Sequence, residues 1–195
     1  MIQLLRELWR KRGGTASIEF AVALPALLVM FMGVFEVSQA LLVYMKVIDV
    51  ADTVSDLVAQ QTKVQSSDID NYYIAGQLVM TPSAGAGLGL YVASVTFDPA
   101  TGAAAVAWEV TRGGAAPMTN AAADLAATNA PNGPLGLACP SVSAIPCDSV
   151  IMAQASYTYN SLLSYLIQKP ITMSSVVFSR PRSVLSIPCT SSPCD

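Results

Sequence analysis

The stretch "WRKRGGTASIEFAVALPALLVMFMGVFEVSQALL", from Trp9 to Leu42, decides the fold. A basic cluster and two glycines lead into a run, Phe20 to Phe35, in which every residue is apolar, glycine or proline. With its apolar flanks this run reaches the length of about 20 residues that a membrane-spanning helix needs. One acid, Glu19, stands at the start of the run, although a carboxylate is costly in lipid. The stretch therefore predicts a membrane helix and leaves Glu19 to be explained.

The helical pattern continues past the apolar run. Apolar residues recur at steps of three and four, which is the period of an amphipathic helix; they include Val37, Leu41, Tyr44, Ile48, Ala51, Val54 and Val58. We expect one helix from about Ile18 to Gln61, roughly 65 Å long at 1.5 Å per residue. This predicts three parts: a leader at 1–14, a long helix at 15–62 whose transmembrane segment is about 18–42, and a domain at 63–195.

The rest of the chain predicts a small α+β domain. "SSDIDNYYIAGQLVM" favours a short helix capped by Ser66, Ser67 or Asp68 and ending near Met80. "LYVASVTFD" and "AAAVAWEVTR" alternate as strands do and are joined by the turn sequence "PATG", so they predict a hairpin. "SVIMAQASYTYN" and "ITMSSVVFSRPR" predict two further strands, whereas 113–147 reads as an irregular loop with one helical turn around 120–127. The fold class is α+β, a long N-terminal transmembrane and amphipathic helix followed by a small antiparallel β-sheet.

The charges are few and unevenly placed. Charged residues make up 12% of the 195-residue chain, against about 25% in soluble domains. Four of the ten basic residues precede Gly13, namely Arg6, Arg10, Lys11 and Arg12. A basic cluster before an apolar run predicts a cytoplasmic N-terminus and an exported C-terminal domain. The acidic remainder offers no footprint for nucleic acid.

The four cysteines all lie late in the chain. An exported chain meets an oxidising compartment, where an even number of cysteines predicts disulfides. Three connectivities are possible, and we favour the local pairs Cys139–Cys147 and Cys189–Cys194, each of which closes a short loop containing proline. The rival is a zinc site formed by all four cysteines, although their spacing is not that of two CxxC motifs.

The sequence contains no constellation typical of an enzyme. The chain has no histidine, which rules out Ser–His–Asp and Cys–His arrangements. "GAGLGL" only loosely resembles a phosphate-binding loop, and it precedes a predicted strand rather than following one. We therefore expect no enzymatic activity, no cofactor and no metal.

The N-terminal motif resembles a known family. "RKRGGTASIEF" is similar to the class III signal peptide of type IV pilin-like proteins: a basic leader, a glycine at the cleavage point, an acid five residues later, and an aromatic residue beside it. "GTASIEFAVALPALLVMFMGVFE" looks closer still to the TadE-like pseudopilins, or minor pilins, of tight-adherence (Flp/Tad) pilus systems. The resemblance is specific over Arg10–Ser38, and weak similarities continue in "AQASYTYNSLLSYL" and "VVFSRPR".

The resemblance implies a processing site and an assembly role. A prepilin peptidase would cleave after Gly14, so that Thr15 becomes the new N-terminus, Glu19 the fifth residue and Phe20 the sixth. In pilin-like assemblies this carboxylate meets the N-terminal amine of a neighbouring subunit. The implied partners are prepilin peptidase, other minor pilins, the major pilin and the inner-membrane assembly platform. The implied location is the bacterial inner membrane, crossed once, with a periplasmic domain and transfer to the pilus or cell surface on assembly.

Two other readings of the N-terminus stay open. "VFEVSQA" offers an A-x-A-like site, and signal-peptidase cleavage after Ala40 would release a soluble periplasmic protein. The run could also be an uncleaved signal anchor in which Glu19 has no role. Under these readings the protein is a periplasmic binding module, held in the membrane where the anchor remains. The position of Glu19 and the apolar stripe through "LLVYM" favour the pilin-like reading.

Overall fold

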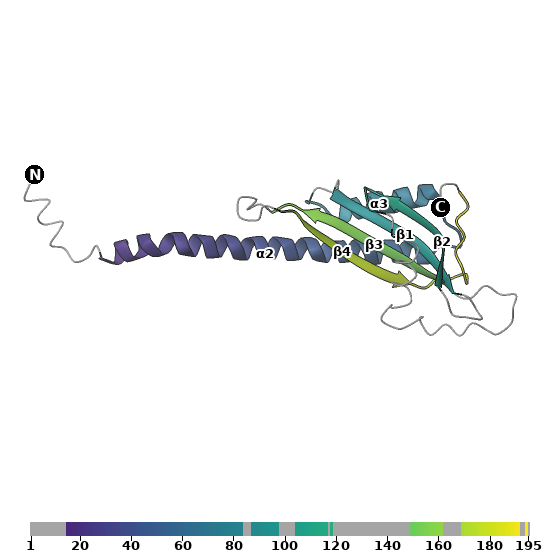
Figure 1. Cartoon of the computed structure of the whole chain (residues 1–195), viewed down its shortest axis with the longest axis horizontal. Coiled ribbons are helices and arrows are strands. Elements are labelled where there is room, and N and C mark those ends of the chain that lie inside the picture. The colour runs from purple at the N-terminus through teal and green to yellow at the C-terminus, as the bar shows by residue number, and fades with distance from the viewer. Residues whose placement is uncertain are drawn as a thin grey trace, which may run out of the picture. The chain divides into compact units, whose positions relative to one another are not determined.

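The computed structural model describes residues 15–83, 87–97, 104–116, 118, 149–161, 169–191 and 194 (Figure 1). Two helices come first, α2 (Thr15–Ala59) and α3 (Ser66–Val79). Four strands follow: β1 (Leu88–Phe97), β2 (Ala104–Arg112), β3 (Ser149–Tyr159) and β4 (Ile171–Ser179). The chain divides into two compact units at Leu41/Leu42, and α2 passes through the division. The predicted α+β class, with a long apolar helix before a four-stranded sheet, is confirmed.

The strands form one antiparallel sheet in the order β2-β1-β3-β4. The predicted hairpin is β1 with β2, and its register shifts between Ser94 and Val95, which marks a β-bulge. β1 also pairs with β3, from Leu88 opposite Tyr157 to Thr96 opposite Ser149. The predicted turn at 99–102 and the predicted helical turn around 120–127 lie outside the described residues.

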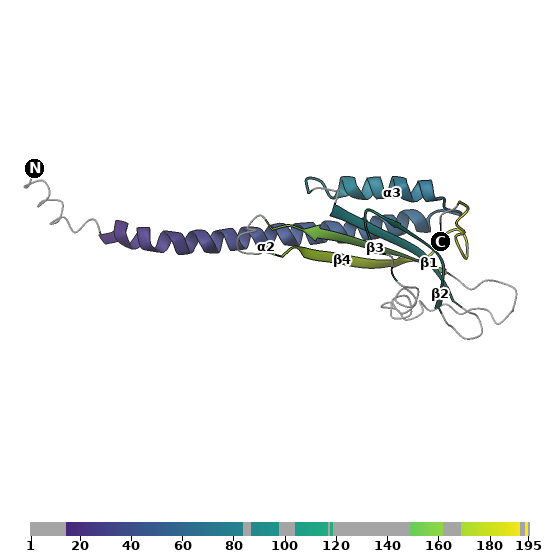
Figure 2. The same ribbon diagram turned by 45° about the horizontal axis from the view of Figure 1, so that its top comes forward.

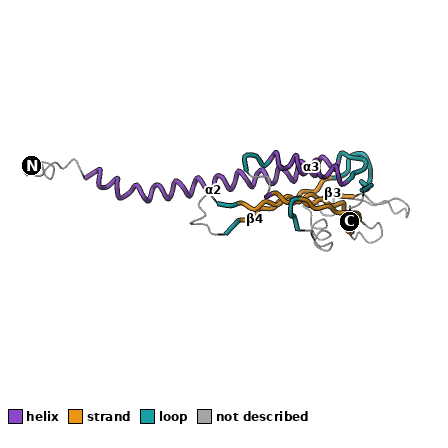
Figure 3. The backbone as a smooth tube through the Cα atoms, turned by 90° about the horizontal axis from the view of Figure 1, so that it is seen from above, coloured by secondary structure: helices purple, strands orange, loops and turns teal. Residues whose placement is uncertain are grey.

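Both helices of the C-terminal unit cover the same face of the sheet (Figures 2 and 3). The buried residues of α2 in this unit follow helical steps and include Val43, Val47, Val50, Val54 and Val58. The two helices approach closely at Gly76 of α3, where a Cβ would lie 3.0 Å from a methyl group of Val50. Glycine thus allows α3 to pack against α2 and β1 at once.

The central strands are buried on both faces. Leu90, Val92 and Ile151 belong to the face beneath the helices, and all are fully buried. On the opposite, outer face, two clusters are also buried: Val95, Phe97 and Val150, and Tyr91, Ala93 and Met152. Ala115 and Met118 pack on the second cluster, so the segment after β2 lies over this face.

The C-terminal tail ties the helices to the sheet through its backbone. Arg182 N donates to the last helical carbonyl group, that of Ala59, at 2.9 Å. Val64 N donates to Pro188 O at 3.1 Å, and Thr190 N donates to Val64 O at 3.0 Å. A disulfide joins Cys189 to Cys194, whose Cα atoms are 6.2 Å apart. Cys139 and Cys147 lie outside the described residues.

The cap of α3 differs from the predicted one. The cap residue is Gln65, whose N–H donates to the Asp68 carboxylate at 2.9 Å. Ser66 instead contacts more distant parts of the chain: its Oγ accepts a hydrogen bond from Arg112 at 2.6 Å, and its N–H donates to Ser191 Oγ at 2.7 Å. Tertiary partners therefore replaced the local serine cap that the sequence suggested.

Candidate functional site

The N-terminal part of α2 presents an apolar surface. The helix from Ser17 to Ala59 is long and apolar enough to cross a membrane, and none of its most apolar window is buried within the chain. Ile18 is 68% exposed, Phe20 60% and Phe31 69%. In water such exposure is unfavourable at about 25 cal/mol per Å². The helix is therefore compatible with a membrane anchor.

Glu19 is exposed on this apolar helix. It lies four residues after Thr15, or about 6 Å along the helix axis. Ala26, Gly33 and Ala40 follow it at steps of seven residues, which keeps them close to one face of the helix. A Cβ built on Gly33 would meet no atom within 4 Å, so this face is open at the glycine. Glu19 thus begins a narrow strip of small residues on a wide apolar surface.

Two other residues of the predicted transmembrane segment, Pro25 and Ser38, affect the backbone hydrogen bonds of α2. Pro25 lies inside the helix, where its ring removes one donor and frees the carbonyl group four residues earlier. Ser38 donates from Oγ to Val34 O at 2.8 Å, so its hydroxyl is satisfied within the helix. Such a bond suits a polar side chain in a segment that lipid surrounds.

Glu36 is a second acid on α2, directly after the apolar run, and nothing in the sequence around it marks it as a functional residue. It is only 4% exposed, whereas its neighbours Phe35 and Val37 are 47% and 60% exposed. The local sequence offers no sign of this burial, because the flanking residues on both sides are apolar and equally suited to lipid.

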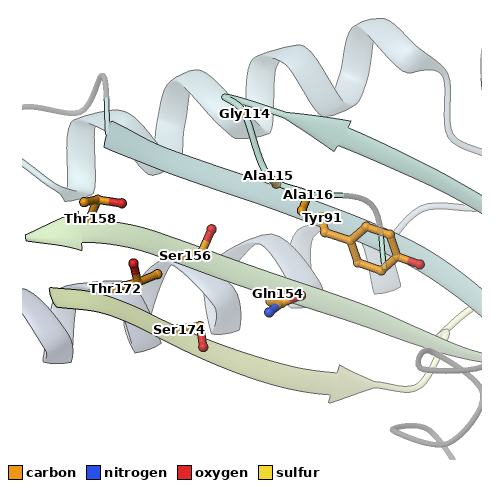
Figure 4. A pocket seen from close by; sticks show the side chains of 9 residues that line it. All are labelled: Tyr91, Gly114, Ala115, Ala116, Gln154, Ser156, Thr158, Thr172 and Ser174. Atoms are coloured by element: carbon orange, nitrogen blue, oxygen red, sulfur yellow. The ribbon is translucent and has the colours of Figure 1, made fainter. Parts of the chain in front are cut away.

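A polar hollow of about 320 Å³ lies on the outer face of the sheet (Figure 4). Its lining residues carry hydroxyl, amide or backbone groups and no charge: Tyr91, Gly114, Ala115, Ala116, Gln154, Ser156, Thr158, Thr172 and Ser174. Gly89 allows one wall to form, since a Cβ there would lie 2.6 Å from Ser156 Oγ and 3.0 Å from the Ala115 backbone. The described residues around the hollow can thus offer neutral hydrogen-bonding groups to a ligand.

The structure describes some of the predicted site residues and not others. Glu19 and Phe20 are neighbours on the exposed part of α2, whose described part begins at Thr15. Gly14 lies outside the described residues, so the proposed cleavage point has no described geometry. Among the described residues no group of three or more histidine, cysteine, aspartate or glutamate side chains could hold a metal.

The comparisons with known proteins point to the same N-terminal segment. Residues 14–56 match the model of the family described as "TadE-like protein". The match is consistent with a TadE-like protein of the Tad pilus system, and it confirms the resemblance noted in the sequence. Neither the curated proteins nor the solved structures gave a match to the chain.

Proposed function

We propose that this chain, whose residues 14–56 match the TadE-like family, is a minor pilin or pseudopilin of a tight-adherence pilus. Prepilin peptidase processes it after Gly14, and it assembles through α2 into the pilus machinery. It then serves pilus biogenesis, adhesion and surface attachment. The observation that carries the proposal is the coincidence of the family match with an exposed apolar helix that carries Glu19 near its start.

The physical role of Glu19 follows from its distance to the new N-terminus. Cleavage leaves a charged amine on Thr15, about 6 Å along the helix from Glu19. A carboxylate in lipid costs about 2.5–3.5 kcal/mol on insertion scales. Pairing between Glu19 of one subunit and the amine of its neighbour offsets this cost, and it does so only when the helices assemble in one register. The strip at Ala26, Gly33 and Ala40 supports this packing because small residues let helix backbones approach.

The proposal includes a set of partners and a location. The chain is an inner-membrane protein with a cytoplasmic N-terminus and a periplasmic C-terminal domain, and it reaches the pilus or cell surface on assembly. Its partners are prepilin peptidase, the other minor pilins, the major pilin and the inner-membrane assembly platform. The basic leader and the apolar helix that follows it support this orientation.

The N-terminus of the purified protein tests the processing step. Mass spectrometry of the membrane-extracted chain should find Thr15 as the first residue, and a Gly14→Arg variant should keep the leader. Small residues let an extended backbone enter the peptidase site, and arginine does not. A mature N-terminus at Leu41, or an intact Met1, would overturn the proposal.

Glu19→Gln tests the assembly step, because it removes the charge and keeps the shape of the side chain. The variant should insert into the membrane and be processed as the wild type is, but its recovery in pilus fractions should fall at least tenfold. Asp49→Asn is the matched control, since it removes an exposed charge from α2 beyond the apolar run. If both variants assemble normally, the proposed pairing of Glu19 is wrong.

A second candidate function rests on the hollow of Figure 4. Its neutral hydroxyl and amide lining suits a periplasmic binding module, in which the N-terminus is uncleaved or cut by signal peptidase. The N-terminal measurement separates the two candidates, because only the pilin reading requires Thr15 as the first residue.

A further inference from the structure

The C-terminal end of α3 exposes apolar side chains. Ile74 is 54% exposed, Leu78 66% and Val79 36%. Ile74 and Leu78 are four residues apart, so they lie on one face of the helix. After Asp70, near its start, the helix contains no charged residue up to its end. Because a helix face in water normally carries charged and polar side chains, this end of α3 is suited to a less polar surrounding.

α3 lies antiparallel to the part of α2 that belongs to the C-terminal unit (Figure 2). Two contacts fix its level along α2. Gly76 comes close to Val50, since a Cβ on the glycine would lie 3.0 Å from a valine methyl group. Lys46 Nζ donates to the carbonyl oxygen of Thr81, just after α3. Lys46 and Val50 lie about 6 and 12 Å beyond Leu42 along the helix axis, and the end of α3 lies between these two levels.

Leu42 is the end of the predicted transmembrane segment, where hydrocarbon gives way to lipid headgroups. The next residues of α2 are typical of this boundary. Tyr44 and Met45 are 41% and 59% exposed, and Lys46 adds a cation, as aromatic and basic residues do at membrane interfaces. The first acid that follows, Asp49, is exposed and lies about 10 Å beyond Leu42. The headgroup layer, about 5–8 Å thick, therefore ends before Asp49.

We propose that the C-terminal end of α3 rests on the periplasmic surface of the inner membrane, with Leu78 and Val79 among the lipid headgroups. The exposed apolar surface of α2 continues to this level, so the membrane that takes the anchor also meets the end of α3. A tilt of about 20°, the average for membrane helices, lowers a helix packed 8–10 Å away by about 3 Å. That tilt brings Leu78 to the depth at which apolar side chains are buried between headgroups and acyl chains.

This contact fixes the tilt and the rotation of the C-terminal unit on the membrane before assembly. The inference rests on the membrane anchor of the proposed function, and it depends neither on cleavage after Gly14 nor on Glu19.

Photo-cross-linking of the full chain tests the contact in vesicles of phosphatidylethanolamine and phosphatidylglycerol. Photoreactive benzoylphenylalanine in place of Leu78 should give at least tenfold more phospholipid adduct, measured by mass spectrometry, than the same residue in place of Asn71. Asn71 is the matched control, because it is exposed and lies seven residues earlier on the same helix face, about 10 Å farther from the membrane. Equal adducts at the two positions, or an adduct at Leu78 only to a second copy of the chain, would overturn the proposal.

A charge on the surface tests whether apolar contact holds α3 on the lipid. With benzoylphenylalanine in place of Val79, Leu78→Asp should lower the lipid adduct at least fivefold. Leu78→Met keeps an apolar side chain and should leave the adduct unchanged; circular dichroism checks that both variants fold. An undiminished adduct in Leu78→Asp contradicts the inference.

The first residue of the same sample, found by mass spectrometry, separates this inference from the proposed function. A chain that begins at Thr15 and gives no lipid adduct at Leu78 overturns the inference alone. A chain that keeps Met1 and gives the adduct supports the inference and overturns the processing step. A chain that begins at Leu41 has lost its anchor and overturns both.

Discussion

Trp108 Nε1 donates a hydrogen bond of 2.7 Å to the carbonyl oxygen of Ile187. The bond is buried and joins β2 to the C-terminal tail across 79 residues of sequence. Ile187 itself is fully buried, and Ser149 N donates to the nearby Leu185 O at 2.9 Å. This part of the tail, Leu185–Ile187, thus forms a strap that is bonded to β2 and β3 on the helix-covered face of the sheet.

Trp108→Phe should weaken this strap. Phenylalanine fills much of the same space but leaves the buried Ile187 carbonyl group without its donor, which costs about 1–3 kcal/mol. We expect the free energy of unfolding to fall by about 2 kcal/mol, measured by circular dichroism on the detergent-solubilised chain. Thr96→Val is the control, because it removes an exposed hydrogen bond to Ala105 O and should cost less than about 0.5 kcal/mol. Equal effects would argue against the strap.

Gly113→Ala should be among the most damaging substitutions in the domain. Gly113 has a φ of 65°, and a Cβ there would lie 2.0 Å from Leu88 O and 2.2 Å from the Tyr73 hydroxyl. The backbone of β1 cannot yield without losing its pairing, so we expect a loss of about 3 kcal/mol or more. Gly114 is the matched control: its φ is 76°, but a Cβ there meets no atom within 4 Å.

Gly114→Ala therefore incurs only the backbone strain, about 1 kcal/mol. Thermal unfolding of the two variants, followed by circular dichroism, should rank Gly113→Ala well below Gly114→Ala. If the two melt together, the close approach of Gly113 to Leu88 does not limit this turn.

The parts of the fold that could be predicted from the sequence rest on local patterns. α2 was expected over about 18–61 and occupies Thr15–Ala59. It could be predicted because the apolar run and the helical stripe are patterns formed by residues close together in the sequence. α3 and the four strands were located in the same way. The two clusters on the outer face of the sheet were not predicted. Val95 and Met152 stand beside other apolar residues, so the sequence does not show which face each strand buries; the register of the sheet and the segment that covers its outer face bury both. The strap was missed because its contacts join residues far apart in sequence.

The candidate site, too, could be predicted from the sequence only where it depends on a local motif. Glu19 and Phe20 stand out in the sequence, since an acid beside an aromatic residue at the head of an apolar run is a local motif. The hollow cannot be recognised in the sequence, because Ser156 and Ser174 become neighbours only through the pairing of β3 with β4.

Ser94→Ala should stabilise the domain. Ser94 is fully buried, and its Oγ has no hydrogen-bond partner among the described residues. Burial of an unpaired hydroxyl costs about 1–3 kcal/mol, and alanine removes it at the loss of few contacts, so we expect a gain of about 1 kcal/mol. Ser149→Ala is the matched control of opposite sign, because the equally buried Ser149 donates to Leu185 O at 3.1 Å. Chemical denaturation should move the two midpoints in opposite directions, and a loss for both would contradict the prediction.

The stability of the domain should fall at high pH through Tyr72. Burial raises the pKa of the Tyr72 hydroxyl above its ordinary value of 10.0, and the nearby carboxylate of Asp68 raises that pKa further. Because the pKa is higher in the folded than in the unfolded chain, the contribution is fully present below about pH 10 and is lost as pH rises toward the folded pKa. Tyr72→Phe should therefore flatten the decline of the unfolding midpoint above pH 10. Tyr73→Phe, which removes the bond to Leu88 O, should instead lower the midpoint already at neutral pH. A Tyr72→Phe variant with the wild-type slope would show that another group sets the alkaline limit.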